Sequence, residues 1–413
     1  MTPKVGVFHP GTQHSWQTAL AFQETRQLGW LATSVFYDPA RWPYRIERFT
    51  PRRLSERLHR DFTRRYSPAL QPQNIRQFGL WEWLETGARR LRAERLAHWA
   101  NRRGNERFGK MAIALIEREP VDVLWGYNTS SLEVFRWGKR HGIHCVLDQT
   151  IGHCAAMNRV MLAEQARNPE FFLKSYTPFS PDDIARQNEE LALADTVVVG
   201  SDFCARTLIE NGCATSKIRI VPYGFDETLF PTHRPHRLPL RDRPMRFLFV
   251  GSVHPRKGVA PLLQAFEQIP AKDAILTLVG RLEIPERTFQ RFAHHVAHVG
   301  SLPRSEVVKY FSNADCFIFP SLFEGSAIVL YEAAAAALGI VQSANAGDGV
   351  REGLNGEIVE NVDVPQLVAV IRSIINDRER LAEWQEASWR MRGERSWRLY
   401  RARIRKLIDQ VIG

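Results

Sequence analysis

The chain has 413 residues, more than one hydrophobic core usually supports, so we expect two domains. An apolar fraction of 44% and a charged fraction of 24% exclude disordered and fibrous classes. The first residues lack the apolar core of a signal peptide, and no stretch approaches the roughly 18 apolar residues of a membrane-spanning helix, so we expect a cytoplasmic protein. Five scattered cysteines without a C-x-x-C pair predict reduced, buried thiols.

Short apolar runs alternate with helical patterns, which indicates parallel strand–helix–strand units and an α/β fold. The expected strands are 4–8, 121–125, 145–148, 196–200, 246–251, 275–280, 315–320 and 339–343. Four prolines within 230–244 predict a linker between two lobes. The predicted ranges are 1–235 for the first lobe, with a helical insertion at 45–107, 236–385 for the second lobe, and 386–413 for a helix that packs back across the lobes.

The insertion carries most of the net charge of +11. It holds 16 arginines, no lysine and seven acidic residues, which favours an acidic partner such as phosphate-bearing lipid or an acidic glycan. Four tryptophans in or beside it also suit an anionic membrane surface: Trp42, Trp81, Trp83 and Trp99. A solvated helical hairpin whose tryptophans pack on the lobe is the alternative. No nucleic-acid motif is recognisable, so we expect no nucleic-acid partner.

A strand ending at Gly251 leads through a polar turn to the cations Arg256 and Lys257. Cations at the carboxyl end of a parallel strand lie where α/β sheets bind ligands, and they would neutralise a departing diphosphate. A solvated basic turn is the alternative for such a pair. Arg281, directly after the strand 275–280, is expected to face the same crevice.

Two glutamates follow one later strand. Glu324 comes after the strand 315–320, and seven residues separate it from Glu332. A helix that starts near Gly325 and Ser326 would direct free backbone N–H groups and the positive end of its dipole at a phosphate. Glu332 could then accept hydrogen bonds from a ribose, and Glu324 from a sugar. The alternative is a capping glutamate and a solvated helical one.

Taken in order, the segments VPYGFDETLF, VGSVHPRKG, LLQAF, LTLVGR, VGSLPRSEVVKYFSNADCFIFPSLFEG and IVLYE resemble the family 4 glycosyltransferases. The resemblance covers 185–360 well and 1–185 loosely. It implies a GT-B fold, in which two Rossmann-like lobes face a central cleft and a C-terminal helix crosses between them. It also implies a retaining transferase with a UDP- or GDP-sugar as donor and no tightly bound cofactor.

The resemblance also implies roles for particular residues. Lys257 would contact the donor diphosphate, Glu332 the ribose, and Glu324 the transferred sugar. The backbone amides of Ser326 and Ala327 would hold phosphate. We therefore expect donor binding along the second lobe at Gly251, Ser252, Arg256, Lys257, Arg281, Ser326, Ala327 and Glu332.

Two features depart from the family pattern. Ser252 stands where the family usually has arginine, so Arg256 would have to serve instead. The N-terminal Gly-Gly loop is replaced by HPGTQH, so the sugar or acceptor side is expected at Gly11, Thr12 and His14. His153 resembles the family's histidine that contacts the donor sugar, and its imidazole could orient a hydroxyl or move a proton. The expected catalytic residues are Glu324, His153 and Lys257.

The sequence thus predicts a retaining glycosyltransferase for the assembly of a cell-surface glycan, a glycolipid or a natural-product glycoside. It would act in the cytoplasm or at the inner face of the membrane. No D-x-D motif is present, so we expect no metal, and no enzyme nucleophile is evident, which favours attack from the face of the leaving group. The alternatives are a sugar-nucleotide epimerase or sugar phosphorylase on the same fold, and a nucleic-acid-binding protein.

Overall fold

The computed structural model describes residues 2–11, 14–38, 42, 44–63, 66–78, 94–235 and 243–412. Two compact units share the chain. The first comprises Met1–Asp148, Arg186–Val198 and Arg401–Gly413, and the second comprises Gln149–Ala185 and Val199–Tyr400. This division differs from the predicted ranges because 149–185 and 199–235 group with the later part of the chain. The boundaries at 235 and 385 stay predictions.

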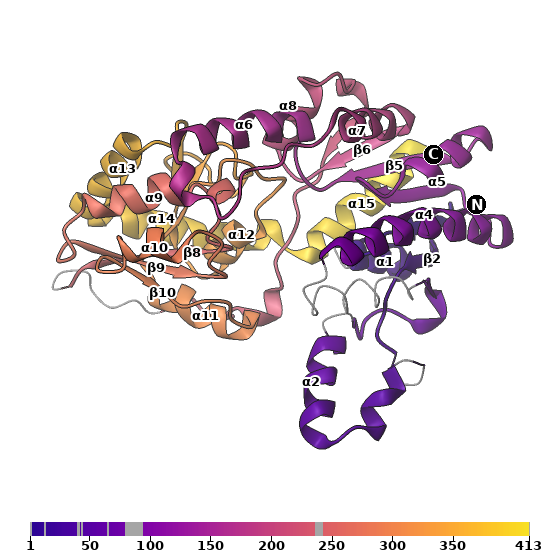
Figure 1. Cartoon of the computed structure of the whole chain (residues 1–413), viewed down its shortest axis with the longest axis horizontal. Helices are drawn as coiled ribbons and strands as arrows, with labels where there is room; N and C mark the ends of the chain where they lie inside the picture. The colour runs from indigo at the N-terminus through magenta and orange to yellow at the C-terminus, as the bar shows by residue number, and fades with distance from the viewer. Residues whose placement is uncertain are drawn as a thin grey trace. The chain divides into compact units, whose positions relative to one another are not determined.

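The first sheet has seven strands in the order β3-β2-β1-β4-β5-β6-β7 (Figure 1). Its strands are β1 (Val5–Phe8), β2 (Leu28–Thr33), β3 (Ile75–Gln77), β4 (Val123–Tyr127), β5 (His144–Gln149), β6 (Thr196–Val199) and β7 (Ile218–Ile220). β1 pairs in parallel with both β2 and β4, so the strand order changes direction between β1 and β4. The expected runs at 4–8, 121–125, 145–148 and 196–200 correspond to β1, β4, β5 and β6.

The helices that accompany this sheet in sequence are α1 (Ser15–Glu24), α2 (Arg52–Thr63), α4 (Glu94–Arg118), α5 (Leu132–Arg140) and α7 (Pro181–Leu193). α2 and the start of α4 confirm helices inside the arginine-rich insertion. A short helical turn, η1 (Tyr44–Phe49), precedes α2. Trp81 and Trp83 lie outside the described residues, as does the side chain of Trp99.

The second sheet has six strands in the order β10-β9-β8-β11-β12-β13, and every neighbouring pair is parallel. Its strands are β8 (Met245–Val250), β9 (Ala274–Val279), β10 (Val296–His298), β11 (Cys316–Phe319), β12 (Gly339–Ser343) and β13 (Gly356–Val359). The helices of this part are α6 (Cys154–Arg167), α8 (Asp202–Ile209), α9 (Val259–Glu267), α10 (Glu286–Gln290), α11 (Arg304–Asn313), α12 (Ile328–Ala335), α13 (Val364–Asn376) and α14 (Arg378–Met391). The order is that of a Rossmann-type sheet, as expected.

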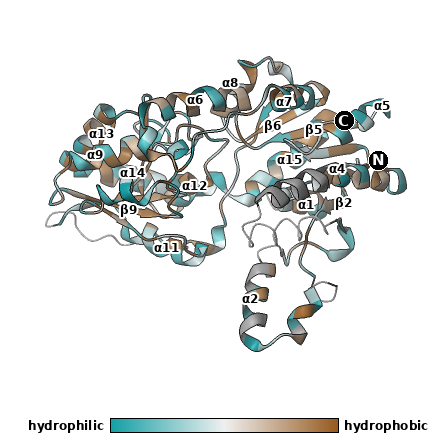
Figure 2. Ribbon diagram, in the orientation of Figure 1, coloured by the Kyte–Doolittle hydropathy of each residue, from teal (hydrophilic) through white to brown (hydrophobic). Residues whose placement is uncertain are grey.

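The central strands of both sheets are buried on both faces. All residues of β11 and β12 are buried, and Figure 2 shows hydrophobic colour concentrated on strands such as β5 and β9. This burial explains why the strands are read as continuous apolar runs in the sequence. The five cysteines, all in described segments, are buried and form no disulfide, as predicted. Among the described helices, none combines the length and apolar character needed to span a bilayer.

The basic segment at the C-terminus is helical, as predicted, but it is interrupted. A 3-10 turn at Arg392–Arg395 separates α14 from α15 (Trp397–Ile412), and it contains Gly393, a residue with low helix propensity. Ile404 and Ile408, four residues apart in α15, are fully buried. α15 begins in the second unit and continues in the first.

Candidate active site

The two loops that build the candidate site follow neighbouring strands of the second sheet. β8 and β11 pair in parallel, with Phe247 opposite Cys316, and the strand order changes direction between them. α/β sheets bind ligands at the carboxyl ends of such strands. The turn that carries Lys257 follows β8, and the turn that carries Glu324 follows β11. The topology therefore brings together two residues that are 67 positions apart in sequence.

The turn after β8 is a short 3-10 helix, Pro255–Lys257. His254 caps it, because its Nδ1 accepts a hydrogen bond of 3.1 Å from the Arg256 amide. Burial, with the charges of Arg256 and Lys257, lowers the pKa of His254 to about 4, so the imidazole caps in its neutral form. Gly258 then adopts a left-handed φ of 69° and leads into α9. The turn thereby aims the Lys257 side chain at the loop after β11.

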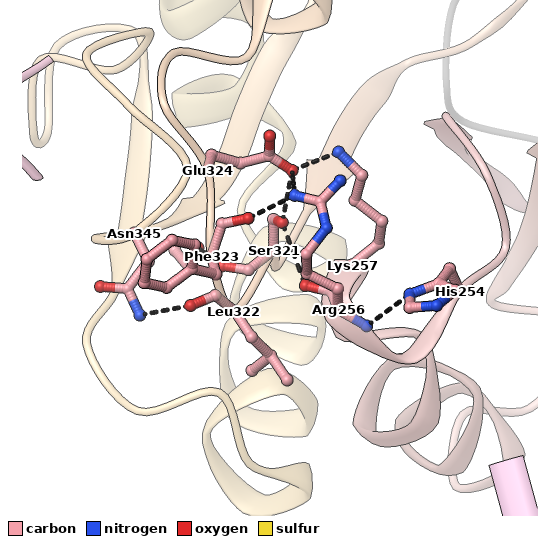
Figure 3. Close-up of polar contacts among 9 residues, drawn as sticks. His254, Arg256, Lys257, Ser321, Leu322, Phe323, Glu324 and Asn345 are labelled. Carbon is pink, nitrogen blue, oxygen red and sulfur yellow. Dashed lines mark hydrogen bonds and ion pairs between the residues drawn. The ribbon is translucent and has the colours of Figure 1, made fainter. Parts of the chain in front are cut away.

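Glu324 is the buried centre of a charged cluster (Figure 3). Its Oε1 accepts hydrogen bonds from Lys257 Nζ, from Arg256 Nη1 at 3.1 Å and from Ser321 Oγ at 2.8 Å. Burial alone would raise the pKa of Glu324, but Lys257 and Arg256 outweigh it and hold that pKa below its ordinary value. Glu324 is therefore a carboxylate. Burial lowers the pKa of Lys257, and the Glu324 carboxylate opposes this shift.

A pocket of about 370 Å³ opens beside this cluster. One part of its wall is apolar and comes largely from Leu229, Phe230 and the apolar residues of α11. The rest of the lining includes the polar residues Lys257, Glu324, Glu332, Arg304 and Ser326. The lining residues are Leu229, Phe230, Val250, Gly251, Lys257, Arg304, Val307, Val308, Phe311, Phe319, Glu324, Ser326, Ala327, Ile328, Val329 and Glu332. The pocket thus combines an apolar wall with three kinds of polar group: cations, carboxylates and a helix start.

Glu332 lies in α12 and faces this pocket together with Arg304, the first residue of α11. Burial raises the pKa of Glu332, and the positive charge of Arg304 opposes this rise, while Asp226 adds to it. Arg304 was not predicted as a site residue. It lies in the sequence Pro-Arg-Ser-Glu at the start of a helix. Nothing in this pattern distinguishes it from an ordinary helix start that is exposed to solvent.

The helix after Glu324 begins later than predicted. The sequence suggested Gly325 or Ser326, but α12 starts at Ile328, because Ala327 has an extended backbone and acts as its N-cap. The Ala327 amide, expected to hold phosphate, here donates to the carbonyl of Ala346 at 3.1 Å. Ile328 and Val329 line the pocket, and amides of a first helical turn have no acceptor within the helix.

Three other predicted donor residues lie outside the lining of this pocket. Arg256 directs its guanidinium to the carbonyl of Phe323 and to Glu324, so it holds the turn after β11 in place. The Ser252 carbonyl accepts from the His254 amide at 2.9 Å. Arg281 pairs with Glu283 and leaves 76% of its side chain exposed.

His153 is buried at the start of α6, as its N-cap. Its Nδ1 accepts from the Ala155 amide at 3.2 Å, so the neutral ring carries its proton on Nε2. Its own amide donates to Thr207 Oγ1 at 3.0 Å. The loop before it packs against the turn of Glu324, since a Cβ atom built at Gly152 would lie 2.6 Å from the Phe323 ring. This loop and the charged cluster are therefore neighbours within the second unit.

The residues expected on the acceptor side belong to the first unit. The Gly11 amide donates to His9 Nδ1 at 3.0 Å, and burial lowers the pKa of His9 to about 4. His14 Nε2 lies 2.9 Å from Oδ2 of Asp148, a fully buried carboxylate at the end of β5. Thr12 lies outside the described residues. His14 and Asp148 thus meet at the carboxyl edge of the first sheet.

Comparisons with known proteins agree with this arrangement. Residues 234–391 match the family model described as glycosyl transferases group 1. AmsK of Erwinia amylovora, an amylovoran biosynthesis glycosyltransferase, is 26% identical over 182 residues, which are 40% of this chain and 43% of AmsK. The GDP-mannose-dependent alpha-(1-6)-phosphatidylinositol monomannoside mannosyltransferase of Mycolicibacterium smegmatis is 28% identical over 246 residues, 52% of this chain and 62% of that protein.

The match to solved structures extends over nearly the whole chain. HepE of Anabaena, solved in complex with UDP, superposes with a TM-score of 0.62 and 13% identity, covering 98% of this chain and 100% of HepE. By contrast, the chain spans about half the length of the curated relatives it matches. The fold is GT-B, and residues 234–391, which contain the Lys257–Glu324 pair and Glu332, match the model of the glycosyltransferase group 1 family.

Proposed function

We propose that the chain transfers a sugar from a nucleoside diphosphate sugar to an acceptor hydroxyl, with retention of anomeric configuration. The observation that carries the proposal is the pocket in which Lys257, Glu324, Glu332 and the start of α12 meet. The UDP in the HepE structure and the GDP-mannose in the name of the mycobacterial relative support UDP or GDP as the carrier. Five buried thiols without a disulfide support a reducing compartment such as the cytoplasm.

In this proposal the diphosphate lies between Lys257 and the first turn of α12. A cation and oriented amides stabilise the negative charge that grows on the diphosphate as its bond to the sugar breaks. Glu332 accepts hydrogen bonds from the ribose, and Arg304 keeps the pKa of its carboxyl from rising further. The apolar wall of the pocket covers the base. No metal and no tightly bound cofactor enter this scheme.

The sugar lies near Glu324 and the loop of His153. Glu324, held as a carboxylate by its cationic neighbours, accepts hydrogen bonds from sugar hydroxyls, and His153 offers the N–H of Nε2 to another. The acceptor hydroxyl attacks from the face of the leaving group, since no residue here is assigned as a nucleophile. Gly11, Thr12 and His14 are proposed to contact the acceptor, a glycan, a glycolipid or a small molecule.

Glu332→Gln is expected to weaken the binding of the correct nucleotide by roughly 1.5–3 kcal/mol, the range for hydrogen bonds to a charged group. The change keeps the size of the side chain but removes its charge. Isothermal calorimetry with UDP and with GDP would measure the loss. Glu360→Gln, at an exposed glutamate, is the matched control and should bind like the wild type. Equal nucleotide affinity of the two variants would show that Glu332 does not bind the nucleotide.

His153→Asn is expected to keep thermal stability and to lower kcat by about tenfold or more, because asparagine retains an N-cap acceptor but lacks the Nε2 donor. His153→Ala, which also removes the cap, should lose activity and in addition about 1 kcal/mol of stability. Melting curves and initial rates for both variants separate the two roles. Full activity of His153→Asn would assign the histidine to capping alone.

The activity itself is tested by a screen of UDP- and GDP-sugars with and without acceptors. A true donor stabilises the protein by mass action and raises its Tm. Release of nucleoside diphosphate that requires an acceptor hydroxyl supports a transferase. Conversion of the nucleotide sugar without any acceptor would favour an epimerase instead, and phosphate-dependent turnover a phosphorylase.

A further inference from the structure

Three large apolar side chains are exposed around η1, just before α2. Trp42 is 66% exposed, Ile46 41% and Phe49 76%. The rings of Trp42 and Phe49 stack on each other, with centroids 6.5 Å apart and planes within 7° of parallel. We call these three residues the aromatic tip. Single exposed apolar residues are ordinary, but a stacked pair with an aliphatic neighbour forms a continuous apolar surface.

Three other aromatic residues of this region are buried by the fold. Tyr37, Tyr44 and Phe62 pack into one buried cluster with Val35, and Leu58 of α2 covers it. This cluster joins η1 and α2 to the chain that leaves β2. Figure 1 shows α2 apart from β2 and the other strands of its unit. The packing therefore buries these residues and leaves the aromatic tip exposed.

The aromatic tip is surrounded in sequence by positive charge. Residues 41–66 contain nine arginines, three acidic residues and no lysine, an excess of six positive charges. Arg45 is exposed, and Arg52 exposes 92% of its side chain. Arginine binds phosphate through two hydrogen bonds from its planar guanidinium. Exposed apolar rings in a segment this rich in arginine match an interface that has phosphate above and hydrocarbon below.

We propose that the aromatic tip inserts into the interfacial region of an anionic lipid bilayer, while the exposed side chains of Arg45 and Arg52 contact lipid phosphates. Aromatic rings are favoured at this depth, and basic residues are attracted by the negative surface. A second copy of the chain suits the surface less well, because two such segments would bring like charges together. The proposal places the membrane contact that the sequence predicted for 45–107 at the aromatic tip, and it does not depend on the identity of the sugar donor.

The test is co-sedimentation of the full chain with vesicles of phosphatidylcholine alone and of phosphatidylcholine with phosphatidylglycerol. We expect binding to the anionic vesicles only, and a marked loss at 1 M salt, where the Debye length is about 3 Å. Trp42→Ser/Phe49→Ser should lower the partition coefficient for anionic vesicles by about tenfold or more, because less apolar area is buried. Arg45→Ser/Arg52→Ser should weaken binding and its salt dependence.

The matched control is Leu173→Ser/Leu354→Ser, since these leucines are 61% and 49% exposed in other parts of the chain. It should bind vesicles like the wild type. All variants change exposed side chains, and melting curves would verify that they fold. Equal partition of the tip variant and the control would overturn the proposal. Failure of the wild type to bind anionic vesicles would also overturn it. If the only change in the tip variant were loss of self-association in ultracentrifugation, the surface would be assigned to contact with a second copy of the chain.

Discussion

Lys257→Ala is expected to lower kcat/KM for sugar transfer by about two to three decades, the range seen when one preorganised group is removed from a developing negative charge. Lys257 is partly buried beside Glu324 and lines the pocket proposed for the diphosphate. Its attraction to the leaving group grows as the bond to the sugar breaks, so the rate should fall more than donor affinity does. Steady-state kinetics and calorimetry with the same donor measure the two effects.

The free energy of unfolding, measured as a function of pH, checks the electrostatics of the same cluster. The folded pKa of Glu324 lies below its ordinary value, so its ionised form stabilises the fold above the unfolded pKa, and this contribution is lost as pH falls through the folded pKa. Lys257→Ala removes one source of this depression, so the loss should begin at higher pH. Lys272→Ala, at an exposed lysine, is the control for both measurements. A kcat/KM within about twofold of wild type, far from one decade, would assign transition-state stabilisation to other groups.

Most strands were predictable because burial on both faces leaves a direct record in the sequence. β11 and β12 carry apolar residues without alternation, and both were placed within a residue of their bounds. β3 and β7 are only three residues long and contain Arg76 and Arg219, so they carry no comparable run. Tertiary pairing with a neighbouring strand, rather than local preference, makes them strands.

The residues of the candidate site and the strands that they follow could be predicted from the sequence. The contacts between their side chains could not. Lys257 and Glu324 meet because β8 pairs with β11, a fact of topology that spacing in sequence does not contain. Arg256 was expected to bind the donor, yet the carbonyl of Phe323 and the carboxylate of Glu324 take its guanidinium. The direction of a cationic side chain depends on which acceptors the fold brings near it. The partner of such a side chain therefore cannot be predicted from the local sequence.

The second large effect is expected at Gly258. Its φ of 69° is a conformation that residues with a Cβ atom adopt at a penalty of roughly 1–2 kcal/mol. A Cβ atom built there would also lie 2.0 Å from the carbonyl oxygen of Pro320, directly after β11. The Cβ atom is fixed to the backbone of residue 258, and the oxygen belongs to the backbone of Pro320. Neither atom can therefore move aside without shifting a turn. Gly258→Ala should therefore lower the free energy of unfolding by about 2–5 kcal/mol, the sum of conformational strain and overpacking.

Gly353 provides a matched control, because its φ is 73° and a Cβ atom built there meets nothing within 4 Å. Gly353→Ala should show the conformational penalty alone, roughly 1–2 kcal/mol. Urea unfolding of the two variants, compared at unchanged m-value, isolates the clash with Pro320. Gly258→Ala should also lose transferase activity below its melting temperature, because the shift that relieves the clash displaces the adjacent Lys257. Equal destabilisation of the two variants would show that the turns after β8 and β11 can separate freely, and that their close approach does not position Lys257 against Glu324.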